Sequence, residues 1–235
     1  MQKLLLLFLV AILISSGSVL GQGIQAGVKG SINSTWLFNN HVSDAAGISQ
    51  GYVPSFGQSY GLSGAIFFSK KLGVEMNFFY DTHRQKYSND DESFESETTL
   101  NRVSIPLMLK LKSTTGAYLE IGAIYNALTK AEFSFAVDSL ALPIRDVKPS
   151  MAKSSVDAML GIGVDINLFA GLSLTTALRF WGSLTDLKGI DSFGGDLSDE
   201  LYLTAVYDGE YQETRGASAG FVVGLVYSIG KIAGE

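Results

Sequence analysis

Asp81-Thr82-His83 is one short stretch whose residue types and spacing suit acid–base chemistry. A carboxylate next to an imidazole can orient the ring as a general base for hydrolysis. Asp81 and His83 stand two residues apart, so on a strand their side chains share a face. The other histidine, His41, lies well before them. We take Asp81 and His83 as the catalytic candidates. We expect only a hydrogen bond between them, and we predict that the protein is not an enzyme.

A second set of residues is charged and alternates with apolar neighbours in predicted strands. Charges in a low-dielectric interior must pair, because an unpaired buried charge costs several kcal/mol. We therefore predict a structural network of salt bridges that fills an interior. The alternative is a narrow polar path for ions. The sequence does not show which acid pairs with the arginine. The members are Lys29, Glu75, Lys110, Glu120, Asp157, Asp165 and Arg179.

Acidic residues also cluster in the stretch NDDESFESE, at Asp90, Asp91, Glu92, Glu95 and Glu97. A second acidic stretch covers residues 191–200. Neither follows the spacing of a calcium-binding loop, and a run of like charges is usually a solvated loop. We therefore expect two exposed acidic loops, no metal site and no cofactor.

The elements that position these residues are strands. In VDAMLGIGVDINL, Val156 to Leu168, apolar residues alternate with Gly, Asn and carboxylates. Such alternation places the two kinds on opposite faces of a strand. Eight segments show the pattern, each near the length that crosses a bilayer at a tilt. The segments are residues 23–33, 60–68, 72–83, 101–111, 117–127, 156–168, 172–184 and 216–228.

The connections alternate in length. Three are short, at residues 69–73, 112–116 and 168–172, and four are long, at about residues 33–59, 83–99, 128–154 and 186–215. We predict an all-β fold, a closed antiparallel transmembrane β-barrel of about eight strands in an up-and-down meander. Short periplasmic turns and long extracellular loops are typical of that class. Residues 201–212 contain the turn pair Asp208-Gly209, which predicts a projecting hairpin or two extra strands.

The composition of the two faces favours lipid outside. The less apolar face is rich in glycine, at Gly61, Gly122, Gly161 and Gly220 among others. Glycine suits a narrow lumen better than a solvated face, because it weakens a strand and packs nothing. Aromatic residues near strand ends fit interfacial girdles. A soluble exported barrel is the alternative.

The first 21 residues resemble a targeting segment. Lys3, an apolar run from Leu4 to Ile14 and small residues before Gln22 predict a cleaved signal peptide. We expect residues 22–235 to form one barrel domain. The chain has no cysteine and a net charge of −6, so neither disulfides nor a basic nucleic-acid footprint is indicated.

The chain resembles the small outer-membrane barrels of Bacteroidetes, the PorT-like or porin-family proteins. The stretches GIQAGVKGSIN, VSIPLMLKLK, YLEIGAIYNAL, VDAMLGIGVDI and LTTALRFWGSLTDL carry the resemblance. It implies a Gram-negative outer-membrane barrel and no single activity. The namesake protein serves type IX secretion, but its N-terminal extension is not evident here, so that role is not carried over.

These observations predict a non-enzymatic outer-membrane protein with a surface-contact or envelope-structural role and a filled lumen. A small pore for ions or solutes is the alternative, and a rim-site hydrolase is a further one. The expected partners are outer-membrane lipid, lipopolysaccharide and surface or envelope proteins, with no nucleic acid.

Overall fold

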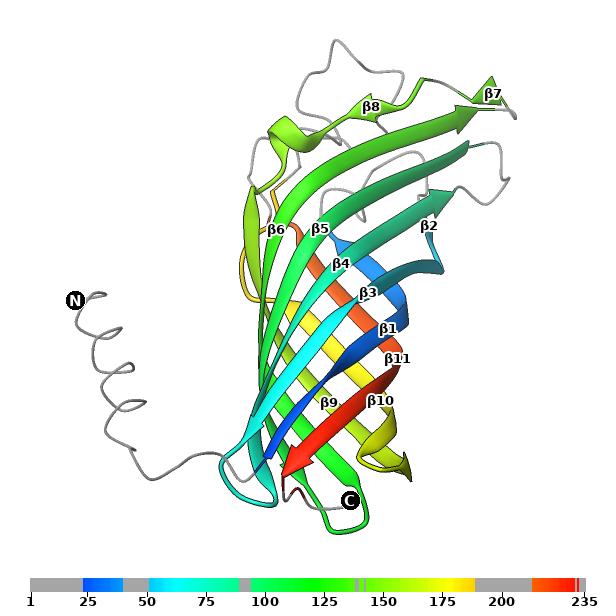
Figure 1. The fold of residues 1–235 in the computed structure, drawn as a ribbon. Helices are drawn as coiled ribbons and strands as arrows, with labels where there is room; N and C mark the ends of the chain where they lie inside the picture. The colour runs from blue at the N-terminus through cyan, green and yellow to red at the C-terminus, as the bar shows by residue number, and fades with distance from the viewer. Residues whose placement is uncertain are drawn as a thin grey trace, which may run out of the picture.

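A computed structural model of the chain describes residues 23–39, 51–88, 94–137, 140–141, 143–188, 213–230 and 232. One antiparallel sheet curls into a closed ring of eight long strands (Figure 1). The long strands are β1 (Gly23–Phe38), β3 (Ser55–Phe67), β4 (Leu72–Ser88), β5 (Phe94–Lys112), β6 (Ala117–Val137), β9 (Ser154–Phe169), β10 (Leu172–Ser183) and β11 (Arg215–Gly230).

Strands that follow one another in the chain are neighbours in the ring, and β1 pairs with β11 to close it. The predicted closed, antiparallel, up-and-down barrel of about eight strands is therefore confirmed. Closure leaves the ring without an open edge, which is how a sheet can satisfy its backbone in lipid. Among the described residues, no helix is long and apolar enough to cross a membrane.

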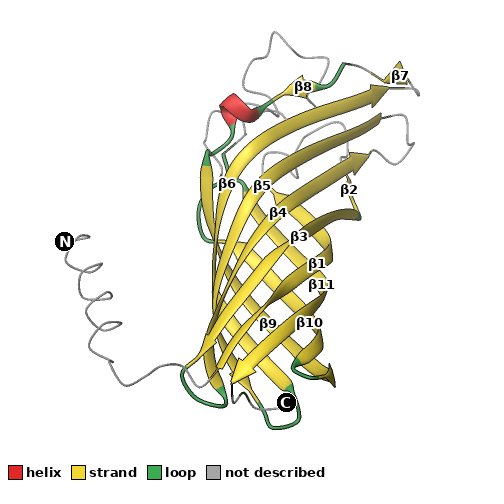
Figure 2. Cartoon of the chain, viewed as in Figure 1, coloured by secondary structure: helices red, strands yellow, loops and turns green. Residues whose placement is uncertain are grey.

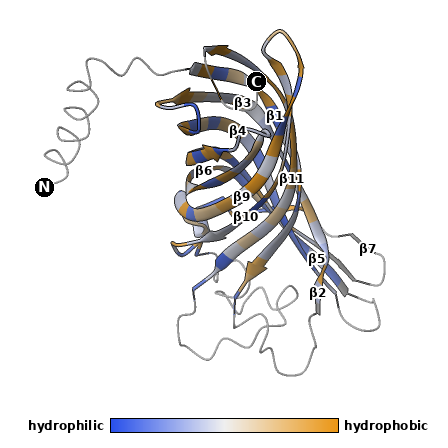
Figure 3. Cartoon of the chain, turned by 90° about the horizontal axis from the view of Figure 1, so that it is seen from below, coloured by the Kyte–Doolittle hydropathy of each residue, from blue (hydrophilic) through white to orange (hydrophobic). Residues whose placement is uncertain are grey.

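Side chains alternate between the two faces of the wall as predicted, and Figure 3 shows hydrophobic and hydrophilic residues alternating along the strands. Ile32, Leu62 and Ile229 point outward and are 64–69% exposed. Glu75 and Glu120 point inward and are 0% exposed. An apolar outside around a charged inside is the pattern of a barrel that faces lipid.

The short connections gather at one end of the barrel, here called the turn end, where β1 also begins and β11 ends (Figure 1). The tightest is the two-residue turn Ala170-Gly171, with φ of 46° and 81°. Positive φ at both positions is what a type I′ hairpin turn requires, and glycine adopts it without strain. The opposite end, here called the loop end, carries the long connections.

At the loop end the strands run further than predicted. Residues 83–99 were expected to form a loop, but β4 continues to Ser88 and β5 starts at Phe94. Glu95 and Glu97 therefore lie in a strand, and their placement in a loop is wrong. Beyond the lipid the outer face becomes polar, so the hydropathy contrast ends while backbone pairing continues.

The predicted loops at residues 33–59 and 128–154 are shortened in the same way, by β1, β3 and β6. Several sequence predictions lie outside the described residues. These are the signal peptide, His41, the acidic residues Asp90, Asp91 and Glu92, the second acidic stretch and the hairpin at residues 201–212.

The upper parts of β4, β5 and β6 project beyond the ring (Figure 2). Three short strands extend this projection: β2 (Gly51–Val53) pairs with β4, while β7 (Leu140–Ala141) and β8 (Arg145–Asp146) pair with β6. A 3-10 turn, η1 (Lys148–Ser150), follows β8. Residues flanking η1, together with Leu187 after β10, pack on the inner side of the projection at the loop end. This apolar cap is made of Leu37, Leu100, Ala131, Phe133, Val147, Met151 and Leu187.

Candidate functional site: the charged lumen

The barrel interior holds ten charged side chains that are at most 4% exposed, five cationic and five anionic among the described residues. They come from six of the eight strands. Within a strand, inward positions recur at every second residue. The cations are Lys29, Arg102, Lys110, Lys112 and Arg179, and the anions are Glu75, Asp81, Glu120, Asp157 and Asp165. Equal numbers of opposite charges allow every buried ion a partner.

Seven of these residues form the turn-side cluster: Lys29, Glu75, Lys110, Lys112, Glu120, Asp165 and Arg179. Arg179 donates from Nε to Glu120 Oε2 at 2.8 Å and from Nη2 to Glu120 Oε1 at 3.1 Å. Its Nη2 also reaches Glu75 Oε1 at 3.3 Å. The sequence left the partner of Arg179 open, and the bidentate contact identifies it as Glu120. Such a fork-to-carboxylate contact fixes the arginine in both position and orientation.

Glu75 is the centre of the turn-side cluster. Besides Arg179, it accepts from Lys29 and, at Oε2, from Lys110 Nζ at 3.1 Å. Lys110 also lies 3.8 Å from the centroid of the Tyr118 ring, a cation–π contact. The cluster thereby joins β1, β4, β5 and β10 across the lumen.

Asp165 extends the cluster toward the turn end. Its Oδ2 lies 2.9 Å from Lys112 Nζ and 3.5 Å from Lys110 Nζ. Lys112 is a member that sequence reasoning missed, because it stands at the boundary between a predicted strand and a predicted turn. Beyond it, Phe67 and Ile232 are 0% and 5% exposed and pack together at the turn end.

The loop-side cluster consists of Asp81, Arg102 and Asp157. Arg102 donates to Asp81 Oδ2 from Nε at 2.8 Å and from Nη2 at 2.5 Å, and its Nη1 lies 4.0 Å from Asp157 Oδ2. Asp157 was predicted to share one network with Glu75 and Arg179, but it contacts Arg102 and accepts from Asn126 Nδ2 at 2.8 Å. Arg102 was missed, although it shares the inward parity of Lys110.

Asp81 and His83 both point inward, yet they do not form the expected hydrogen bond. Ser59 Oγ donates to Asp81 Oδ1 at 2.7 Å, and Arg102 occupies the other oxygen. His83 Nε2 donates to the Trp36 carbonyl at 3.0 Å, and Arg102 Nη2 faces its Nδ1 at 3.4 Å. Arg102 therefore stands between the acid and the ring, which removes the geometry of a general-base pair.

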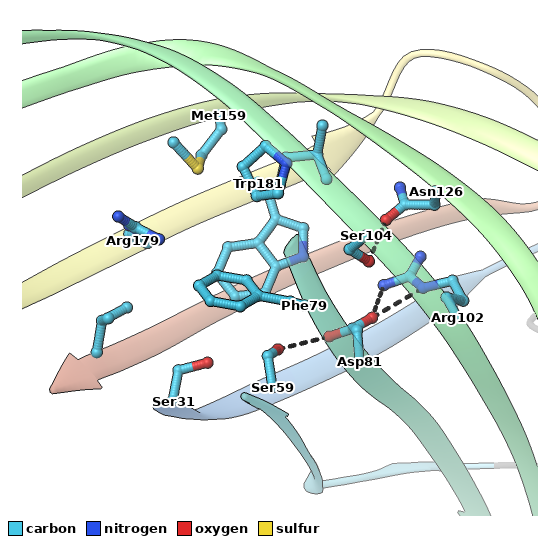
Figure 4. A pocket seen from close by; sticks show the side chains of 13 residues that line it. Ser31, Ser59, Phe79, Asp81, Arg102, Ser104, Asn126, Met159, Arg179 and Trp181 are labelled. Atoms are coloured by element: carbon cyan, nitrogen blue, oxygen red, sulfur yellow. Dashed lines mark hydrogen bonds and ion pairs between the residues drawn. The ribbon is translucent and has the colours of Figure 1, made fainter. Parts of the chain in front are cut away.

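A small cavity of about 30 Å³ separates the two clusters (Figure 4). Arg179, Asp81 and Arg102 border it, and much of its wall is apolar. That volume has room for about one or two water molecules. Its apolar lining consists of Phe79, Pro106, Ile124, Met159, Trp181 and Val222.

Tyr87 is a buried ionisable group beside the apolar cap, outside the membrane-spanning part. Its hydroxyl donates to the Leu37 carbonyl at 3.1 Å. Burial raises the pKa of the Tyr87 phenol well above its usual value, because the phenolate would lose its hydration. Within the described ranges, no three acidic or histidine side chains are grouped to hold a metal ion.

One protein-family model and several solved structures of outer-membrane proteins are similar to this chain. Residues 16–189 match the family model described as outer membrane protein β-barrel domain. The crystal structure of the outer membrane protein OprG from Pseudomonas aeruginosa aligns with 12% identity and a TM-score of 0.49, covering 89% of this chain and 96% of that one. Ail, the attachment invasion locus protein of Yersinia pestis, aligns with 10% identity and a TM-score of 0.39, covering 87% of this chain and 99% of that one.

No curated protein sequence matches the chain. The two structural likenesses carry no role to it. The family match spans about three quarters of the residues and coincides with seven of the eight strands of the ring. The chain belongs to the family of outer membrane proteins defined by this β-barrel domain.

Proposed function

We propose that the protein is a non-enzymatic outer-membrane barrel with a sealed lumen that works through its surface, as a contact or structural protein of the envelope. The observation that carries this proposal is the balance of the ten buried charges. A conducting pore needs a continuous aqueous path with weakly held ions. Here Arg179 binds Glu120 beside it and Glu75 across the lumen, and all three side chains are at most 3% exposed.

Three further layers support a closed interior. The turn end is filled by Phe67 and Ile232, and the loop end by the apolar cap. The cavity between the charged clusters has room for water but not for a solute. A barrel closed at both ends and in the middle interacts with other molecules through its outer surface and its loop end.

The proposal includes a topology. The short turns face the periplasm and the loop end faces outward, as in other outer-membrane barrels. The proposal also includes export directed by a signal peptide over residues 1–21. We also propose that the protein is one of the PorT-like barrels of Bacteroidetes, supported by stretches such as GIQAGVKGSIN and VSIPLMLKLK. No part in type IX secretion is proposed.

Conductance tests the sealed lumen directly. The mature chain, from Gln22 onward, would be inserted into planar bilayers after a heat-dependent gel shift has shown that it is folded. We expect no discrete channels from the wild type. Arg84→Met, which removes an exposed cation, serves as a matched control for Arg179→Met. Discrete wild-type channels that Arg179→Met or Glu120→Gln alters would reject the sealed lumen and support a pore.

The same folded, mature protein can be used to test the alternative of a hydrolase with its site at the rim. The contacts of Arg102 with Asp81 and His83 support a structural role for both residues. Hydrolysis of a peptide or ester library that disappears in folded His83→Ala protein would contradict the non-enzymatic proposal.

A further inference from the structure

The last residues of β1 are held in part by side chains of β4 rather than by a second strand. The ladder between β1 and β3 ends at Thr35 with Ser55, so among the described strands the final three residues of β1 pair with β11 alone. Inward positions recur at every second residue of β4, and at its loop end they are His83, Gln85 and Tyr87. All three of these side chains are at most 2% exposed.

Each of these three side chains binds the backbone of β1, and we call the three contacts the β1 clasp. His83 Nε2 donates to the Trp36 carbonyl at 3.0 Å. Leu37 N donates to Gln85 Oε1 at 3.0 Å, and the Tyr87 hydroxyl donates to the Leu37 carbonyl at 3.1 Å. A buried backbone group that has no strand partner must be satisfied in another way, and the β1 clasp does so with side chains.

The surroundings of His83 suit a neutral ring. Because Nε2 donates to β1, Nδ1 of the neutral ring is an acceptor, and Arg102 Nη2 of β5 faces it at 3.4 Å. Asp81 shares the strand and the face of His83, but its two oxygens already accept from Ser59 and Arg102. On the side of β11 the ring meets Gly216, which carries no charge. A proton on Nδ1 would therefore set a second cation against Arg102 and find no free carboxylate.

His83 lies beyond the lipid boundary, where its outward neighbour Arg84 is exposed. Burial and the Arg102 guanidinium lower the pKa of His83 to about 4, although Asp81 and the Trp36 carbonyl act in the opposite direction. In a released, hydrated segment the pKa of the ring would return to about 6.5. The closed clasp therefore favours the neutral ring. Its stabilisation by His83 is complete above about pH 6.5 and is lost as the pH falls toward about 4.

An amide side chain at position 83 would also donate to the Trp36 carbonyl, but histidine adds a charge that depends on pH in this range. We propose that His83 is an acid-sensitive latch: its protonation breaks the β1 clasp, releases the end of β1 from β4 and loosens the loop end. The proposal adds a response to external acid to the surface role, and for the source of that acid it rests on the outward orientation of the loop end in the proposed function. The turn-side cluster takes no part in it.

Fluorine NMR of tryptophan tests the latch at the residue that His83 holds. The chain has two tryptophans, Trp36 and Trp181, so a folded barrel labelled with 5-fluorotryptophan gives two signals, which Trp181→Phe assigns. The mature protein in detergent micelles would be titrated from about pH 7.5 down to about pH 4. We expect the Trp36 signal to shift with a midpoint between about pH 4 and 6.5. Tyr87→Phe, which weakens the β1 clasp, should raise this midpoint by about half a pH unit.

Two matched variants separate the latch from other titrating groups. His83→Gln keeps a donor for the Trp36 carbonyl and cannot become charged, so the shift should disappear, whereas His41→Gln removes the other histidine of the chain and should titrate like the wild type. A wild type without a shift, a His83→Gln variant that titrates like the wild type, or a His41→Gln variant that does not titrate would each overturn the proposal. A silent barrel that fails this titration loses the latch alone, whereas a conducting barrel that passes it loses the sealed lumen alone.

Discussion

Arg179 on β10 binds Glu120 on β6 with nitrogen–oxygen distances of 2.8 and 3.1 Å, and both residues pair in register with Gly161 of β9. Neither strand is adjacent to the other, since β9 lies between them. The pair therefore joins two strands over the glycine of the strand between them, whereas the Arg179–Glu75 contact reaches β4 on the far side of the ring. This relationship makes the turn-side cluster a structural element in its own right.

Breaking the Arg179–Glu120 pair on one side will destabilise the barrel more than replacing both partners. Arg179→Met leaves Glu120 buried without its main counter-ion, at a cost of about 3–5 kcal/mol. The double change Arg179→Met with Glu120→Leu removes both charges and should recover a large part of that loss. Urea unfolding in lipid vesicles, followed by tryptophan fluorescence, measures all three variants. Additive losses would show that the two residues act independently.

Arg102 should matter far more to folding than His83. Arg102→Met removes the counter-ion of two buried carboxylates, Asp81 and Asp157, so we expect a loss of about 3 kcal/mol or more. His83→Gln retains a donor for the Trp36 carbonyl and should cost about 1 kcal/mol or less. The same urea titration compares them. A larger loss from His83→Gln would mean that the ring, not the guanidinium, organises this end of the lumen.

Several features of the lumen follow from sequence alone and others do not. Period-two alternation places Glu75, Asp165 and Arg179 on the inner face, because a strand leaves only two orientations. Which acid meets Arg179 depends on the stagger of three strands around the ring, and no local pattern encodes that stagger. Arg102 had the correct parity, so a stricter use of alternation would have included it.

The strand ends at the loop end illustrate a different limit. On β4, Arg84 and Lys86 point outward while Gln85 and Tyr87 point inward. The alternation persists there, but both faces carry polar atoms because the outside meets water or headgroups. A hydropathy pattern that identifies strands by contrast consequently stops at the edge of the lipid, and β4 continues past it.

Glycines of the wall should respond to alanine according to the face on which they lie. A Cβ on Gly61 would stand 1.9 Å from the Phe78 carbonyl oxygen, whereas a Cβ on Gly64, three residues along β3, would meet nothing within 4 Å. We expect Gly61→Ala to cost about 1–3 kcal/mol by forcing the strands apart, and Gly64→Ala to be nearly neutral. Equal urea midpoints for the two variants would contradict this account of the inner face.

The lipid-facing surface can be mapped with arginine. Ile162 lies near the middle of the outward stripe of β9 and is 54% exposed, while Ser154 begins the same strand. Ile162→Arg should cost about 2–4 kcal/mol in vesicles and Ser154→Arg about 0–1 kcal/mol, because the penalty falls toward the interface. Vesicle insertion yields and urea midpoints would both report the difference. Equal tolerance at the two sites would argue that this stripe does not face acyl chains.

Ile232 lies just beyond β11 and yet is buried. It is 5% exposed and packs with Phe67 and Ala65 at the turn end, whereas Ile229, three residues earlier, points to lipid and is 66% exposed. Ile232→Ala leaves a cavity beneath Phe67, so we expect a loss of about 2 kcal/mol or more, and Ile229→Ala should lose less because lipid fills the space. Ile232→Glu would further bring a carboxylate near Lys112, which already lies 5.7 Å from the Phe67 ring centroid. If Ile232→Ala matched wild type in urea while Ile229→Ala did not, the residue after the last strand would have no part in closing the turn end.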